Sequence, residues 1–309
     1  MHVVVTGAAG FLGRALTGAL LADGETVTAL DRRLYVGLAS DGLDVITADL
    51  LDRDDGIRQA LASADTVFHL AGCPGVRDRG AAVAWARHRD NVLATARVLA
   101  LVPRRTPLVV TSSSSVYGGA PGAPGRPSVE DDPVRPLGGY ARSKVAVEEL
   151  CARRAAAGGN VVVARPFTVA GEGQRPDMAL ASWLAAARTD RPLRVLGSLD
   201  RTRDVTDVRD VVRVLRDLAA GGTPGTVNVG TGVGRPLRDL VAAVGAALDI
   251  DVRTVIVPAE RVEPADTLAD TRRLRALLGY VPRTDLLDLV ASQAAASQAA
   301  PPRQPVLVT

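Results

Sequence analysis

The feature that most constrains this fold is a glycine-spaced turn directly after the first apolar run. His2–Thr6 is short and β-branched, which predicts a fully buried parallel strand. Gly7, Gly10 and Gly13 follow, and the helical pattern of Arg14–Leu21 begins at once. Glycines between a strand and a helix let the backbone approach a pyrophosphate and aim free N–H groups at it. The spacing G-x-x-G-x-x-G differs from the G-x-G-x-x-G of dehydrogenases, and a plain tight turn is the alternative.

Acidic residues follow the next two expected strands. Thr26–Leu30 ends at Asp31, where a carboxylate can bind an adenosine ribose and repel a 2′-phosphate, which favours NAD over NADP. Arg32 and Arg33 come next and could instead bind that phosphate. Asp49 lies within the third expected strand and its loop, residues 45–50, where it would meet the adenine edge or remain a surface carboxylate.

The fourth expected strand, Thr66–Gly72, ends in small residues that would let a cofactor pass close. His69 lies in its apolar part and is interpreted as a hydrogen-bonded core histidine. Arg77, in the loop that follows, faces an anion or solvent. Asn91 begins or continues a helix that runs to Ala100.

Hydroxyl groups cluster after the fifth expected strand, Leu108–Thr111, where residues 112–115 are all serine. The carboxyl ends of strands are where open α/β sheets bind ligands, although four serines could also form only a polar turn. Residues 119–139 are rich in glycine and proline, which predicts an extended loop or lid. A helix is expected over residues 143–157.

Tyr140 and Lys144 lie four residues apart, so on a helix they share one face. The ammonium group is expected to lower the pKa of the phenol from its ordinary value near ~10. A phenol of lowered pKa can take a proton from a sugar hydroxyl, and one of the serines could share that proton. Solvated helix surface is the alternative for such a pair.

Composition excludes several classes of protein. The 309 residues are 47% hydrophobic and 23% charged, while aromatic residues make up only 3%, so stacking platforms for nucleic acid are not expected. The 37 basic and 34 acidic residues are interspersed, which gives no basic tract. Two cysteines form no metal or disulfide pattern, and no signal peptide or membrane-length apolar run is present. We expect a cytoplasmic protein without a metal, a membrane partner or a nucleic-acid partner.

Taken together, the glycine turn, Asp31, the serine strand and the Tyr140/Lys144 pair resemble the extended short-chain dehydrogenases/reductases of the NAD-dependent epimerase/dehydratase family. The resemblance extends to about Gln293. It implies a Rossmann-type doubly wound parallel sheet with a smaller C-terminal α/β substrate domain. The NAD-binding domain would comprise residues 1–165 and about 204–230, the nucleotide-sugar-binding domain residues 166–203 and 231–294, and residues 295–309 a flexible tail. The resemblance also implies a homodimer through helices near residues 91–101 and 143–157.

The resemblance assigns roles to individual residues. Tyr140, Lys144 and Ser113 would be catalytic. NAD would be bound by Gly7, Gly10, Phe11, Leu12, Gly13, Asp31, Arg32, Asp49, Leu50, Leu70, Ala71, Gly72, Asn91, Thr111, Tyr140, Lys144 and Pro166. The nucleotide sugar would be bound by Arg77, Ser113, Ser114, Thr168, Arg175, Met178, Arg203 and Asp266, with Asp204 orienting Arg203.

One departure from the family pattern narrows the activity. Family dehydratases carry Asp-Glu where this chain has Ser114 and Ser115. A hydroxyl with a pKa far above 7 is a poor base for removing water. The departure argues against a dehydratase and, less strongly, against a decarboxylase of the family.

The segment from Phe167 to Leu180 is similar to the corresponding part of UDP-glucuronate 4-epimerases, in which Thr168 and Arg175 would bind the sugar carboxylate. A strand-to-helix loop with a salt-bridged Arg175 is the alternative, and Ala170 replaces the usual tyrosine. The expected function is therefore a 4-epimerase that interconverts UDP-glucuronate and UDP-galacturonate with tightly bound NAD. The alternatives are an NADPH-dependent 4-ketoreductase, a 4-epimerase of the UDP-glucose/galactose type, and a non-catalytic dinucleotide sensor.

Overall fold

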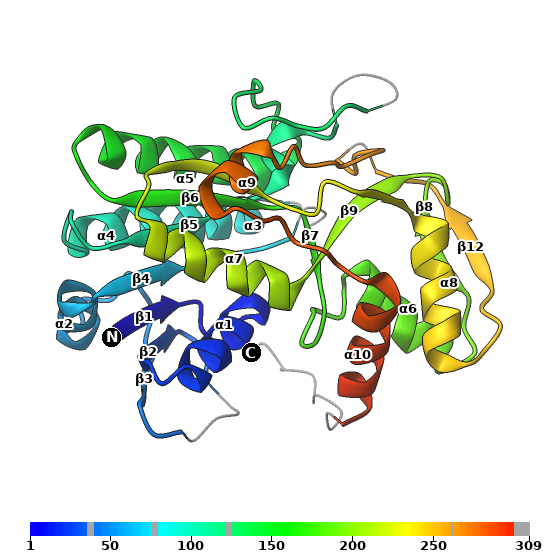
Figure 1. The fold of residues 1–309 in the computed structure, drawn as a ribbon, viewed down its shortest axis with the longest axis horizontal. Coiled ribbons are helices and arrows are strands. Elements are labelled where there is room, and N and C mark those ends of the chain that lie inside the picture. The colour runs from blue at the N-terminus through cyan, green and yellow to red at the C-terminus, as the bar shows by residue number, and fades with distance from the viewer. Residues whose placement is uncertain (36–39, 76–79, 121–124, 261, 300–309) are drawn as a thin grey trace.

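In the computed structural model, residues 1–35, 40–75, 80–120, 125–260 and 262–299 are described. Their main element is a seven-stranded parallel sheet with the order β10-β6-β5-β4-β1-β2-β3. A second lobe with two small sheets, β11-β9-β7 and β12-β8, lies beside it (Figure 1). The doubly wound parallel sheet confirms the fold class expected from the sequence.

The large sheet takes its strands from most of the chain. They are β1 (His2–Thr6), β2 (Thr26–Asp31), β3 (Leu43–Thr47), β4 (Thr66–His69), β5 (Leu108–Thr111), β6 (Val161–Pro166) and β10 (Gly225–Val229). The connecting helices are α1 (Phe11–Ala22), α2 (Asp55–Ser63), α3 (Ala81–Arg87), α4 (Ala94–Leu101), α5 (Gly138–Ala156), α7 (Val208–Gly221) and α9 (Arg272–Leu278).

Successive side chains along each strand point to opposite faces of the sheet, and helices cover both faces. Val3 and Val5 of β1 pack on one face with residues of α1, α7 and α9. Val4, between them, packs on the other face with residues of α2, α4 and α5. Because both faces of the sheet are covered, the central strand β1 is almost entirely buried, as its apolar run predicted.

The second lobe contains β7 (Thr168–Ala170), β8 (Leu193–Leu196), β9 (Thr202–Asp207), β11 (Gly234–Pro236) and β12 (Thr254–Val257). Its helices are α6 (Ala179–Ala187), α8 (Leu237–Leu248) and α10 (Leu286–Ala299). One apolar core joins β7, β8, β9, α6, α8 and α10, and α10 packs against α8. In Figure 1, α10 lies on the side of this lobe that is nearer the large sheet. Among the described residues, no helix is long and apolar enough to cross a bilayer, and no group of side chains is arranged to hold a metal ion.

Three expected helix boundaries are wrong. The helix expected over residues 143–157 begins earlier, at Gly138. The pattern of Leu268–Leu278 also predicts a helix, but Leu268–Asp270 is extended, because Ser128 N–H donates to Leu268 O (2.8 Å) and Asp270 N–H donates to Ser128 O (2.9 Å). Residues 295–299, expected to be tail, continue α10, where Arg188 donates to Ala294 O at 2.5 Å. Residues 300–309 lie outside the described part.

The expected helix at Asn91–Ala100 also differs. The helical segment begins earlier, at Ala81, and His88–Leu93 forms a π-helical turn between α3 and α4. π-Helical turns add one residue to a helix and are frequent at functional sites. Here the wide turn includes Asp90 and Asn91, both buried.

Candidate active site

A cleft of about 1210 Å³ runs along the carboxyl ends of the central strands and into the second lobe. It gathers residues that the sequence analysis singled out in eight separate segments. The predicted residues that line it are Gly7, Gly10, Phe11, Leu12, Gly13, Asp31, Arg32, Asp49, Leu50, Leu70, Ala71, Gly72, Thr111, Ser113, Ser114, Tyr140, Lys144, Pro166, Thr168, Arg175, Met178 and Arg203.

Two other predicted residues do not line the cleft. Asn91 is buried beneath it, where its amide binds Ser143 Oγ at 2.8 Å and accepts from Cys73 N–H at 2.6 Å. Asp266 accepts hydrogen bonds from the backbone and hydroxyl of Thr202 at 3.0 and 2.7 Å. Both therefore hold cleft-forming segments in place. Arg77 lies outside the described residues.

The glycine turn between β1 and α1 is too tight for other residues. Gly7 has φ = 72°, and a Cβ there would lie 2.6 Å from Ala71 N. A Cβ at Gly13 would collide with Gly7 O. The turn thus leaves a backbone cradle at the start of α1, and this is the shape that a dinucleotide pyrophosphate requires.

At the adenosine end of the cleft, carboxylates hold both candidate phosphate-binding arginines. Asp31 accepts from Ala9 N–H at 3.0 Å and from the Arg33 backbone at 2.9 Å, and it pairs with the Arg33 guanidinium at 3.3 Å. Arg32 pairs with Asp90 at 2.8 Å. A 2′-phosphate would have to displace these carboxylates, so the residues fit NAD better than NADP.

The three candidate catalytic residues meet at the middle of the cleft. Tyr140 lies in the first turn of α5, and the Ser113 hydroxyl is near enough to favour the ionised form of its phenol and so lower its pKa. Lys144, one turn later, is buried, and its Nζ donates to Thr111 O at 2.8 Å. The same Nζ lies 5.9 Å from the centre of the Tyr140 ring. The geometry places a proton acceptor, a hydroxyl and a cation around one point.

The expected effect of Lys144 on the pKa of Tyr140 is wrong. Burial raises the pKa of Tyr140 above its ordinary value, and the groups that oppose this rise are Ser113, Arg175 and Arg87. Lys144 itself is penalised by burial, which lowers its pKa to about 8. The physical reason is that its ammonium group faces the Thr111 carbonyl rather than the phenol oxygen.

A buried polar network, not anticipated from the sequence, supports the catalytic residues. Glu148 follows Lys144 by one turn of α5 and accepts from Ser112 Oγ at 2.5 Å. The same carboxylate forms a two-bond ion pair with Arg165 of β6, at 2.8 and 2.6 Å. Ser112 precedes Ser113, so this network joins the ends of β5 and β6 to α5. The i,i+4 spacing from Lys144 was the only signal for Glu148 in the sequence.

Arg87 is a second residue that the sequence analysis missed. It is buried at the end of α3, and one of its Nη atoms donates to Gly75 O at 2.5 Å. A Cβ on Gly139, next to Tyr140, would lie 3.0 Å from its other Nη atom. Arg87 therefore packs between the loop after β4 and the start of α5.

His69 is a hydrogen-bonded core residue, in agreement with its interpretation from the sequence. Its ring nitrogens lie 2.7 Å from Thr6 Oγ1 and 2.9 Å from Thr95 Oγ1. Burial lowers its pKa to about 3, so the ring is neutral at physiological pH.

Across the cleft, the segment after β7 carries Arg175. Its guanidinium binds Asp177 through two hydrogen bonds, Nε–Oδ1 at 2.9 Å and Nη2–Oδ2 at 2.5 Å. Gln174 fixes this loop by donating to Val169 O at 3.0 Å and accepting from Gln293 of α10 at 2.9 Å. The C-terminal helix thus helps to position Arg175.

Arg203, at the far end of the cleft, donates to the carbonyl oxygens of Thr202, Ala265 and Pro264 at 2.8–2.9 Å. Asp204 was expected to orient it, and this expectation is wrong. The Asp204 carboxylate accepts instead from Thr231 and Gly232 and from Ala269 N–H, so it fastens the turn after β10.

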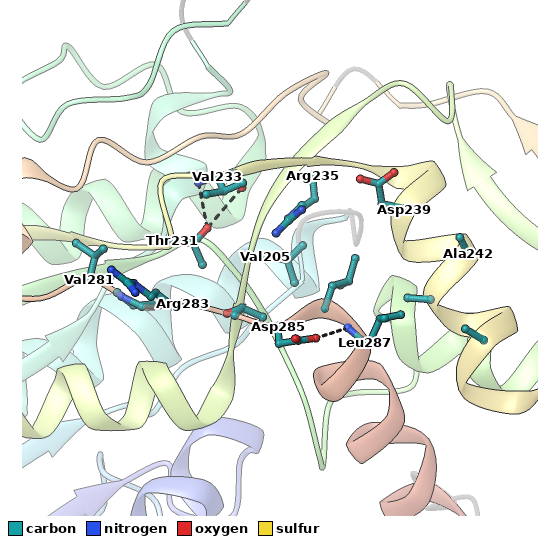
Figure 2. Close-up of a pocket in the computed structure, with 15 residues that line it drawn as sticks. Val205, Thr231, Val233, Arg235, Asp239, Ala242, Val281, Arg283, Asp285 and Leu287 are labelled. Atoms are coloured by element: carbon teal, nitrogen blue, oxygen red, sulfur yellow. Dashed lines mark hydrogen bonds between the residues drawn. The ribbon is translucent and has the colours of Figure 1, made fainter.

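A second cavity, of about 890 Å³, lies between β9, α8 and the segment that precedes α10. Figure 2 shows its labelled side chains, in which aliphatic residues lie together with the charged residues Arg235, Asp239, Arg283 and Asp285. None of its lining residues was singled out as a site residue from the sequence. The candidate active site is therefore the larger cleft.

Known proteins share this architecture. A family model described as "NAD dependent epimerase/dehydratase family" matches residues 3–230. A UDP-glucose 4-epimerase from Mycolicibacterium smegmatis is 32% identical over 308 residues, which cover 94% of this chain and 96% of that protein.

Two solved structures extend the comparison. MoeE5 in complex with UDP-glucuronic acid and NAD is 35% identical, with a TM-score of 0.85 over 96% of this chain and 99% of that chain. The UDP-glucuronic acid 4-epimerase from Bacillus cereus, in complex with UDP-glucuronic acid and NAD, is 27% identical, with a TM-score of 0.87 over the same shares.

Proposed function

Since this chain belongs to the NAD-dependent epimerase/dehydratase family and is an NAD-dependent enzyme acting on nucleotide sugars, we propose that it is a UDP-glucuronate 4-epimerase. It would interconvert UDP-glucuronate and UDP-galacturonate. The observation that supports this proposal is that Tyr140, Ser113, Thr168 and Arg175 all line the same cleft. A proton acceptor and a carboxylate-binding cation thus face one sugar-sized space.

Tyr140, Ser113 and Lys144 each have a distinct task in the proposed reaction. Tyr140, whose phenol must first ionise against the effect of burial, would take the proton of the sugar O4. Ser113 would hydrogen-bond to the same oxygen and orient it. NAD, when bound, supplies the acceptor that takes the C4 hydride and gives it back. The 4-keto sugar turns in the cleft, and Tyr140 returns the proton to O4 after the hydride has added to the opposite face. Lys144 would hold the ribose next to the nicotinamide.

The carboxylate needs firm binding because oxidation at C4 makes the uronate a β-keto acid. Such an acid loses CO₂ when the C5–C6 bond stands perpendicular to the carbonyl plane. Arg175 offers two parallel N–H donors, the arrangement that binds a carboxylate most directionally, and Thr168 adds a hydroxyl. Together they would hold the carboxylate near the carbonyl plane and prevent decarboxylation.

Three observations bear on the alternatives. The carboxylates on Arg32 and Arg33 disfavour a ketoreductase that consumes NADPH. A 4-epimerase of neutral UDP-sugars is the second candidate, and it is favoured by the Arg175–Asp177 pair, because Asp177 already occupies two N–H donors of the arginine. MoeE5 has also been solved with UDP-glucose and NAD, at 36% identity to this chain.

We further propose a homodimer that packs through α4 and α5.

The test is to incubate the enzyme as purified with UDP-glucuronate, without added cofactor, and to identify the sugar by NMR. UDP-galacturonate supports the proposal. Turnover that requires added NADPH, or conversion of UDP-glucose with none of UDP-glucuronate, refutes it.

A further inference from the structure

The guanidinium proposed to bind the substrate carboxylate already holds a carboxylate of its own. Arg175 and Asp177 form a two-bond ion pair, at 2.9 and 2.5 Å, and both side chains line the main cleft. Asp177 is 60% exposed and Arg175 33% exposed, so a ligand entering the cleft meets both groups.

Hydrogen bonds other than this ion pair also hold the loop. Gln174 fixes the same segment through Val169 O at 3.0 Å, Ala181 N–H at 3.2 Å and Gln293 at 2.9 Å. Exposed ion pairs contribute little to stability in general. A stabilising role is therefore a weak explanation for an aspartate placed inside the cleft, directly on this arginine.

We propose that Asp177 competes with the ligand's carboxylate for Arg175 and thereby sets how strongly the site discriminates acidic from neutral hexoses. The inference rests on the proposed function, because it takes Arg175 as the group that meets C6 of the sugar. It assigns Asp177 as a specificity-determining residue.

The competition follows from charge and hydrogen-bond geometry. A uronate must displace or share the two N–H donors that Asp177 occupies, and its carboxylate then lies near a second carboxylate, which repels it. A neutral hexose leaves the ion pair intact, and its C6 hydroxyl can donate to an Asp177 oxygen. Asp177 thus disfavours one ligand without disfavouring the other, which is how a site sets specificity by repulsion.

The experiment compares binding of UDP-glucuronate and UDP-glucose by calorimetry. It uses NAD-loaded Tyr140→Phe protein, in which turnover is blocked, with and without Asp177→Asn. The matched control is Asp190→Asn, which removes the same charge from an exposed ion pair with Arg253 outside the cleft. Asp190 has φ = 50°, a conformation that asparagine tolerates well.

Asp177→Asn should lower the Kd of UDP-glucuronate about three- to tenfold and change the Kd of UDP-glucose by less than about twofold. Asp177→Ser should give the same shift, and Asp190→Asn should change neither value. The inference is overturned if the ratio of the Kd of UDP-glucuronate to the Kd of UDP-glucose in Asp177→Asn stays within twofold of the parent ratio. The absence of UDP-glucuronate binding in both proteins also overturns it.

The outcome is separable from the proposed function. Wild-type enzyme that fails to epimerise UDP-glucuronate refutes the function, while the Kd ratio still decides the role of Asp177. Wild-type enzyme that epimerises UDP-glucuronate, with a Kd ratio unchanged by Asp177→Asn, keeps the function and refutes the role.

Discussion

The ammonium group of Lys144 is hydrogen-bonded to the carbonyl oxygen of Thr111, at 2.8 Å, and not to the phenol of Tyr140. The bond ties the catalytic helix α5 to the end of β5. It also means that the burial of each side chain, rather than mutual attraction, dominates the two pKa values. Burial raises the pKa of Tyr140 and lowers the pKa of Lys144.

The first prediction concerns the titration of Lys144, which is the only lysine in the chain. Because burial disfavours its charged form, we expect its pKa to be about 8 in the cofactor-free protein. The measurement is the ¹³C NMR shift of the protein after reductive methylation, which labels only this amine and the N-terminus. The same signal in urea-unfolded protein should titrate near 10.5, and equal pKa values in both states would contradict the prediction.

The second prediction concerns the proton acceptor. Tyr140→Phe should lower kcat by about 10³-fold or more while NAD remains bound, because only the proton acceptor is lost. Tyr280→Phe is the control, since its hydroxyl binds Asp217 outside the cleft. Retention of more than a tenth of the activity in Tyr140→Phe would assign the proton transfer to another group.

The third prediction concerns the carboxylate site. Arg175→Ala should raise the KM of UDP-glucuronate about tenfold or more, since a charge-assisted two-bond contact is lost. It should also release some UDP-pentose, because the 4-keto uronate is no longer held near the carbonyl plane. Mass spectrometry of the product mixture detects both sugars. Normal turnover of UDP-glucuronate without pentose would show that Arg175 does not bind the carboxylate.

The fourth prediction concerns the buried network behind the catalytic serines. Glu148→Gln removes the charge that compensates Arg165, and both side chains are nearly buried, at 12% and 6% exposure. We expect the free energy of unfolding to fall by about 3 kcal/mol. Glu149→Gln, the exposed neighbour on the same helix, should change it by less than about 0.5 kcal/mol. Urea denaturation of both variants measures the difference, and equal values would contradict the network's role.

Local sequence patterns predicted the sheet well because each strand and turn carries its own signal. The run His2–Thr6, the glycines after it and the acid at Asp31 all lie where a parallel sheet and a dinucleotide cradle require them. The Tyr140/Lys144 spacing likewise indicated a helix, and both residues lie on α5. These features depend on neighbours in sequence, which a single chain displays directly.

Contacts between distant segments could not be predicted in the same way. The extended form of Leu268–Asp270 depends on bridges to Ser128, about 140 residues away in sequence. The Glu148–Arg165 pair depends on how α5 packs against β6. The pKa of Tyr140 depends on burial, which no spacing rule reports. Asp177 lies only two residues from Arg175 in sequence, but its ion pair with Arg175 inside the cleft could be identified only from the structure.

The central claim is that C4 of an acidic sugar is oxidised and reduced again within one cleft, with the same hydride returning to the opposite face. The most direct measurement is to give the enzyme UDP-glucuronate that carries deuterium at C4, without added cofactor, and to examine the product by NMR. The account predicts UDP-galacturonate with the deuterium still at C4. A product that has lost the label, a pentose, or an unchanged substrate would contradict it.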